Sequence, residues 1–118
     1  MKYSIDKKKN HTIVVKPDGR LVGEFQTLQL NDELDELIED KYYRVVFDMS
    51  ELEYINSTGL NFFLKILTKV RKCDGEVVLC SLNELLKTLM VTTKLNSFFT
   101  ICDNVKDALE HLEKEKSL

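Results

Sequence analysis

Strand-like and helix-like patterns alternate along this chain from residue 30 onwards. Short apolar runs at residues 45–47 and 77–80 predict buried strands, and residues 97–101 predict a last strand. Around these runs, apolar residues recur at the spacing of a helical face and predict helices at residues 30–38, 60–70, 82–90 and 105–112. Strands joined by helical crossovers pair in parallel, with a right-handed connection. The alternation therefore predicts an α/β layer structure.

The start of the chain predicts an antiparallel hairpin. The runs "TIVV" at residues 12–15 and "RLV" at residues 20–22 are strand-like, and "KPDGR" between them is a turn signature. Added to parallel strands, this hairpin gives a mixed β-sheet with about four helices in a single layer. A length of 118 residues suits one core, so we expect a single domain over residues 1–118.

Charge and cysteine content exclude several classes of protein. Seventeen basic and 20 acidic side chains give a net charge of −3, which offers no general attraction for nucleic acid or anionic lipid. No apolar run has the length of a membrane span and no signal-peptide pattern is present, so we expect no membrane insertion and a cytoplasmic location. Cys73, Cys80 and Cys102 form no Cys-x-x-Cys pair, as expected of reduced thiols.

Residues suited to catalysis are sparse. His11 and His111 do not neighbour a nucleophile in the sequence, and metal-ligand spacing is absent. The serine at position 57 lacks the Gly-x-Ser-x-Gly pattern of a nucleophile elbow because Ile55 stands in the place of the first glycine. Glycine-rich phosphate loops are also missing. We therefore expect no enzyme activity, no catalytic residue, no cofactor and no metal.

The most informative segment is "RVVFDMSELEYINSTGL" at residues 44–60, where a strand leads into a helix. One interpretation is a helix cap, in which Asn56 or Ser57 accepts hydrogen bonds from the first free N–H groups. The other interpretation is phosphorylation, because a phosphoserine in the first turn places its negative charge against the positive end of the helix. The spacing of the residues is compatible with both.

This segment, together with the order of elements, resembles the STAS domain of bacterial anti-sigma factor antagonists. The family pattern is an apolar strand ending in Asp-x-Ser, then Asp-Ser-(Ser/Thr/Ala)-Gly-(Leu/Ile) at the start of a helix. Asp48 and Ser50 match the first part, and residues 57–60 match the second. The "GRL" at residues 19–21 lies where the family often has Gly-x-Leu-Asp. The resemblance covers nearly the whole chain.

The resemblance implies a switched binding module in sigma-factor-dependent transcription. It implies that the chain binds an anti-sigma factor that is also a serine kinase, and that phosphorylation of Ser57, with Thr58 as the alternate acceptor, ends the binding. A phosphatase would restore the unmodified form. The expected contact surface is Asn56, Ser57, Thr58, Gly59, Leu60 and Asn61. The charge and the lack of an obvious exposed apolar stripe suggest a monomer.

Two positions depart from the family pattern. Asn56 replaces the Asp that precedes the phosphorylated serine, and Val22 replaces the Asp of Gly-x-Leu-Asp. Asparagine keeps the capacity to cap a helix but has no negative charge for a kinase to use. An alternative role is therefore a STAS interaction subunit that is not phosphorylated, in a lipid-transport or stress-signalling complex.

Overall fold

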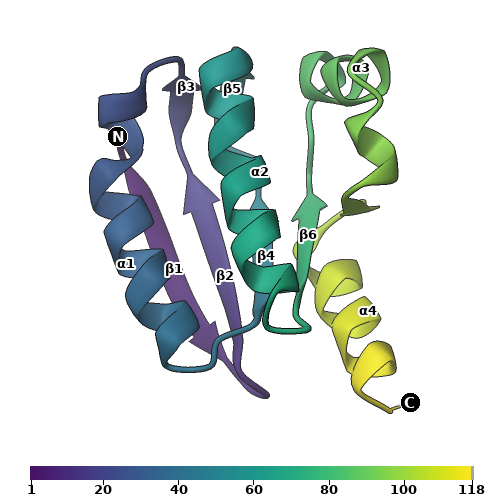
Figure 1. The fold of residues 1–118 in the computed structure, drawn as a ribbon. Coiled ribbons are helices and arrows are strands. Elements are labelled where there is room, and N and C mark those ends of the chain that lie inside the picture. The colour runs from purple at the N-terminus through teal and green to yellow at the C-terminus, as the bar shows by residue number, and fades with distance from the viewer. Residues whose placement is uncertain (118) are drawn as a thin grey trace.

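The computed structural model describes residues 1–117, and a five-stranded β-sheet lies at its centre (Figure 1). The strands follow the order β1-β2-β4-β6-β7. β1 pairs antiparallel with β2, and the other neighbours in this sheet pair in parallel. The predicted mixed sheet with an N-terminal antiparallel hairpin is confirmed. The strands are β1 (Tyr3–Lys8), β2 (Thr12–Pro17), β4 (Arg44–Asp48), β6 (Glu76–Cys80) and β7 (Thr100–Cys102).

Four α-helices lie around this sheet within residues 1–117, as the apolar spacing predicts. They are α1 (Leu28–Glu39), α2 (Ser57–Arg71), α3 (Glu84–Thr92) and α4 (Val105–Ser117). Two short 3₁₀ helices precede α1 and β7, η1 at Glu24–Thr27 and η2 at Leu95–Ser97. The last strand is shorter than the predicted 97–101, because η2 takes up the start of that run.

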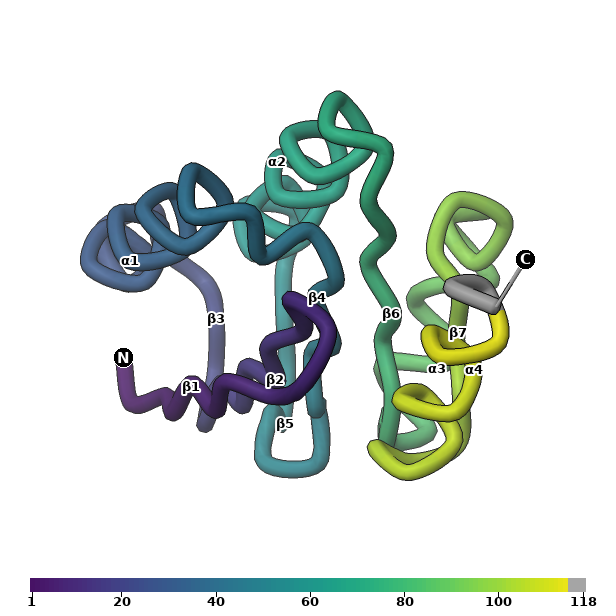
Figure 2. The backbone as a smooth tube through the Cα atoms, turned by 90° about the horizontal axis from the view of Figure 1, so that it is seen from below, coloured from purple at the N-terminus to yellow at the C-terminus, as the bar shows by residue number. Residues whose placement is uncertain are grey.

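Helices cover both faces of the central sheet. Because successive side chains of a strand point to opposite faces, Val45 and Phe47 of β4 belong to the core beneath α1 and α2. Val46 of the same strand faces the opposite way, in a second cluster with Ala108 and Leu112 of α4. Figure 2 shows α1 and α2 together on one side of β1 and β2. One face of the central sheet is thus covered by α1 and α2, and the opposite face is covered by α4.

The strands of the hairpin differ from those predicted. β2 pairs with β1, a strand that the apolar patterns of the sequence do not predict. Asn10 and His11, in the turn between the two strands, have positive φ angles of 62° and 56°, as tight hairpin turns often require. The predicted pairing of residues 12–15 with residues 20–22 is therefore wrong.

The "KPDGR" turn instead leads the chain out of the central sheet. Gly19 in this turn has a φ of 94°, a conformation that side chains rarely adopt, and its N–H donates to the carbonyl of Glu51 (2.9 Å). The turn delivers the chain to β3 (Gly19–Leu21), which pairs in parallel with β5 (Leu52–Ile55). β3 and β5 form a separate two-stranded sheet immediately before α2.

Candidate functional site

The site suggested by the sequence lies at the N-terminus of α2, where Asn56 caps the helix. Asn56 has an extended backbone, and its Oδ1 accepts a hydrogen bond from the N–H of Gly59 (3.1 Å). Its Nδ2 donates to the carbonyl of Val22 (2.9 Å), and its backbone N–H donates to the carbonyl of Leu21 (3.3 Å). Of the two candidate caps, Asn56 therefore fills the role, and it also holds the segment that follows β3.

Ser57 is the first residue of α2, and its side chain is exposed. Within the described residues, its hydroxyl makes no hydrogen bond and no acidic side chain lies in the first turn of α2. The first N–H groups of a helix lack partners inside the helix and carry partial positive charge. The hydroxyl is thus accessible, and a phosphate attached to it would lie at a favourable electrostatic position.

The other residues of the expected contact surface divide into two groups. Asn61 is exposed and Thr58 is half-buried, so both can contribute side-chain atoms to a surface around Ser57. Gly59 and Leu60 are buried. A Cβ at Gly59 would lie 2.5 Å from the carbonyl oxygen of Leu21, which shows how closely α2 approaches β3. Gly59 and Leu60 therefore pack the start of α2 against the protein and do not contribute side chains to the surface.

The family-like Asp-x-Ser element forms a turn at the end of β4. The backbone N–H of Ser50 donates to Oδ1 of Asp48 (3.1 Å). An aspartate that bonds a backbone N–H two residues on stabilises such a turn. These two residues thus help to direct the chain from β4 into β5 and on to Ser57.

An apolar groove of about 220 Å³ borders Ser57 on the side of α3. Leu85, on the outer face of α3, is 52% exposed beside it. The spacing of apolar residues puts Leu85 with the apolar face of its helix. The spacing therefore does not predict that the Leu85 side chain is exposed. The groove is lined by Tyr54, Ile55, Asn56, Ser57, Leu60, Leu85, Leu86, Leu89 and Thr93.

A second group of exposed apolar side chains, which we call the anchor patch, lies in the segment that follows β3 and contacts Asn56. It consists of Val22, Phe25 and Leu28, all exposed, in the connection from β3 through η1 to α1. The hydrogen bond from Asn56 to the carbonyl of Val22 joins this connection to the start of α2. Sequence reasoning missed the patch, although Val22 stood out as a departure from the family pattern.

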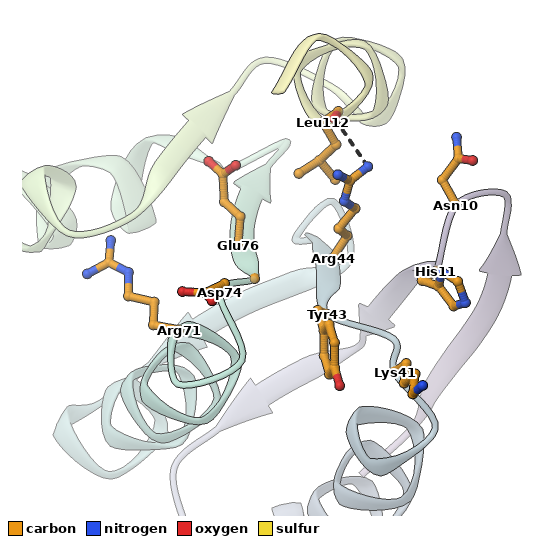
Figure 3. Close-up of a pocket in the computed structure, with 10 residues that line it drawn as sticks. Asn10, His11, Lys41, Tyr43, Arg44, Arg71, Asp74, Glu76 and Leu112 are labelled. Carbon is orange, nitrogen blue, oxygen red and sulfur yellow. Dashed lines mark hydrogen bonds between the residues drawn. The ribbon is translucent and has the colours of Figure 1, made fainter. Parts of the chain in front are cut away.

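A wide depression lies at the opposite end of α2, beside Arg71 (Figure 3). It has a volume of about 910 Å³ and lies near the first residues of β4 and β6. Its two arginines contact backbone carbonyls, since Arg44 donates to Leu112 (3.4 Å) and Arg71 donates to Phe98 (2.6 Å). The depression is lined by Asn10, His11, Lys41, Tyr43, Arg44, Arg71, Asp74, Gly75, Glu76 and Leu112.

Both histidines lie at this opposite end. His11 lines the depression, and Nε2 of His111 lies 2.9 Å from Oε1 of Glu76. In the part of the chain that the structure describes, no group of three His, Cys, Asp or Glu side chains is arranged to hold a metal ion. No helix in that part has both the length and the apolar character needed to cross a membrane.

Comparison with known proteins agrees with this arrangement. The model of the STAS domain matches residues 3–108. Among curated relatives, the "putative anti-sigma factor antagonist BtrV" of Bordetella bronchiseptica is 30% identical over 96 residues, covering 75% of this chain and 83% of the relative. Among solved structures, a "putative anti-sigma factor antagonist" from Thermotoga maritima superposes with a TM-score of 0.84 at 23% identity, covering 94% of both chains.

The anti-sigma factor antagonist SpoIIAA has the same fold. Its unphosphorylated form superposes with a TM-score of 0.75 at 13% identity, covering 99% of this chain and 100% of that chain. The phosphorylated form of SpoIIAA, from Bacillus, also gives a TM-score of 0.75, at 12% identity and with coverage of 94% and 99%. These solved structures thus share the arrangement of sheet and helices described above.

Proposed function

Because this chain belongs to the STAS domain family, we propose that it is an anti-sigma factor antagonist that phosphorylation of Ser57 switches off. In its unmodified form it binds an anti-sigma factor and so releases a sigma factor for transcription. The relative at 30% identity carries the name of such an antagonist. The proposed action takes place in the cytoplasm, with the chain acting as a monomer.

The observation that carries this proposal is the exposed, unbonded hydroxyl of Ser57 between two apolar surfaces. The groove beside α3 lies on one side of it, and the anchor patch lies on the other. Apolar surface beside an exposed polar centre is typical of a protein-binding site. A partner that covers this end of α2 would therefore enclose the hydroxyl.

Phosphorylation of Ser57 would weaken binding of the partner more than it would destabilise the fold. A phosphate adds a charge of about −1.5 to −2, and the free N–H groups at the start of α2 can accommodate it. Within a closed interface the same charge must lose its hydration, which costs free energy. A loss of about 3 kcal/mol in binding free energy lowers the affinity roughly 100-fold. The switch thus needs no rearrangement of the core.

Ser57 is a better acceptor than Thr58 because its side chain is exposed, whereas Thr58 is half-buried. We assign the phosphorylation to a serine kinase, the anti-sigma factor itself, and the reversal to a phosphatase. Asn56 supplies the cap without the carboxylate of the family pattern. If the kinase requires that carboxylate, the chain instead acts as an interaction subunit that is not phosphorylated.

Two measurements test the proposal together. The first is the intact mass of the protein from its native host, with and without phosphatase, for the natural chain and for Ser57→Ala and Thr58→Val. We expect one phosphatase-sensitive phosphate, lost only in Ser57→Ala. The second is the affinity of Ser57→Asp for a purified anti-sigma factor of the serine-kinase class from the same organism, with Ser57→Ala as control. We expect weakened binding for Ser57→Asp alone.

The possible results separate the alternatives. Phosphate retained in Ser57→Ala and lost in Thr58→Val would move the acceptor to Thr58. No phosphate under any growth condition, with equal affinity for Ser57→Asp and Ser57→Ala, would remove the switch and favour the subunit that is not phosphorylated.

A further inference from the structure

We propose that the anchor patch, Val22, Phe25 and Leu28, inserts into an apolar pocket of the anti-sigma factor, with Phe25 as the residue that contributes most to affinity. This inference rests on the proposed function and extends it, because the expected contact surface in the sequence was confined to residues 56–61. Ser57 then controls binding, whereas Phe25 supplies much of its strength.

The exposure of the patch is the first argument. Phe25 is 88% exposed, the largest fraction among the exposed large hydrophobic residues of the described chain, and Leu28 and Val22 are 56% and 42% exposed. An aromatic side chain left in water forgoes the free energy of burial, about 25 cal/mol for each Å² of apolar surface. The three residues lie within seven positions of one another, and a group of exposed apolar side chains is a feature of binding sites.

The backbone that carries the patch is held in place, which is the second argument. Oε1 of Gln26 accepts hydrogen bonds from the N–H groups of Val22 (2.7 Å) and Gly23 (2.8 Å), and its Nε2 donates to the carbonyl of Arg20 (2.8 Å). Thr27 Oγ1 donates to the carbonyl of Glu24 (3.0 Å). A pre-organised segment loses little conformational entropy on binding. Phe25 is thus presented on a fixed support.

Continuity with Ser57 is the third argument, and it decides the occupant. Asn56 caps the helix that begins at Ser57, and the same side chain donates to the carbonyl of Val22. Leu21, which precedes Val22, pairs with Ile55 in the two-stranded sheet. Val22 therefore adjoins the residue that precedes Ser57, and a partner released by phosphate at Ser57 lies beside the segment that carries Phe25.

The departures from the family pattern fit this surface. Val22 replaces a carboxylate with an apolar side chain that extends the patch, and the amide of Asn56 donates to the carbonyl of Val22, as an ionised aspartate could not. The partner is therefore an anti-sigma factor whose facing pocket is apolar and large enough for a phenyl ring. Aromatic residues in such pockets are frequent hot spots of binding energy.

The test compares Phe25→Ala with a matched control, Phe98→Ala. Phe98 is also exposed, at 51%, and its carbonyl accepts from Arg71 at the far end of α2. The probe is a purified anti-sigma factor of the serine-kinase class from the same organism, titrated by calorimetry against unphosphorylated protein. We expect Phe25→Ala to weaken binding about 30-fold, the size typical of an aromatic hot spot, and Phe98→Ala to bind as the natural chain does. Circular dichroism verifies that both variants fold.

Each outcome bears on one level of the proposal. If the natural chain binds with high affinity and Phe25→Ala binds equally well, the anchor is overturned while the proposed function stands. If the natural chain binds no anti-sigma factor, the proposed function fails and the anchor fails with it. If gel filtration shows dimers of the natural chain that Phe25→Ala abolishes, the occupant is a second copy of this chain and the choice of partner is overturned.

Discussion

At the scale of single residues, Asn56 joins two segments that lie 34 residues apart in the chain. Its Oδ1 caps α2, and its Nδ2 holds the carbonyl of Val22. An aspartate could perform the first task with a favourable charge at the helix N-terminus, but it has no donor for the second when ionised. Compared with an aspartate, Asn56 thus lacks a negative charge near Ser57 but makes an additional hydrogen bond to the segment that carries the anchor patch.

Substitution of Asn56 separates these two tasks. Asn56→Ala removes both hydrogen bonds and should lower the free energy of unfolding by about 1–2 kcal/mol. Asn56→Asp keeps the cap and loses only the bond to Val22, so its loss should be smaller. Urea unfolding followed by circular dichroism measures both variants. Asn61→Ala, at an exposed position in the same helix, should leave the free energy of unfolding within about 0.5 kcal/mol of the natural value. Equal midpoints for all three would show that the Asn56 side chain contributes nothing.

At the scale of elements, α2 packs against β3 through the bare backbone of Gly59. A methyl group there would meet the carbonyl of Leu21 at 2.5 Å and the side chain of Ile55 at 3.1 Å. This contact explains why a residue that disfavours helices occurs in the first turn of α2. The Ser-Thr-Gly sequence thus combines an exposed hydroxyl with a close approach of helix and strand.

Gly59→Ala should therefore destabilise the protein by about 1–3 kcal/mol, the usual cost of overpacking. Helix propensity alone would predict the opposite sign, because alanine favours a helix by about 1 kcal/mol over glycine. The midpoint of urea unfolding shows whether Gly59→Ala lowers the stability, as overpacking predicts, or raises it, as helix propensity predicts. Lys65→Ala, at an exposed position of α2, serves as the neutral control. A rise in stability for Gly59→Ala would contradict the close contact.

The sequence predicted the elements that bury large apolar faces and missed those that do not. Helices α1 to α4 and strands β4 and β6 have clear apolar patterns, and the cap at residues 56–57 could be named in advance. β1 was missed because half of its side chains are charged and it lies at the edge of the sheet. β5 has four residues, too few for a period to show, and the strand predicted at residues 20–22 corresponds to β3 but pairs with β5. The exposure of Phe25 depends on contacts that no spacing reveals.

At the scale of the whole molecule, the two faces of the central sheet are unequal. The face under α1 and α2 holds the larger core, and the opposite face relies on α4. Cys80 of β6 lies in this second cluster, directly beside Cys102 of β7 in the register of the two strands. Burial, followed by the charge of Asp48, raises the pKa of the Cys80 thiol to about 12. Burial also raises the pKa of Cys102.

These thiols should make the fold sensitive to alkali. A thiol whose folded pKa is raised stays protonated in the native state, while in the unfolded chain it ionises near its ordinary value of 9.0. Its contribution to stability is present in full below about pH 9 and is lost as the pH rises towards 12. Urea midpoints measured from pH 9 upward should fall more steeply for the natural chain than for Cys80→Ala. Parallel curves would show that the thiol of Cys80 ionises equally well in both states.

The separate sheet of β3 and β5 has a consequence for how such chains diverge. The residues that we propose to face a partner are carried by the turns around this small sheet and by the first turns of α2 and α3, whereas the large core belongs to the five-stranded sheet. After a gene duplication, two copies can change residues such as Val22 and Phe25 while retaining the same interior. Several proteins with this fold can then be present in one cell, each binding its own anti-sigma factor and not those of the others.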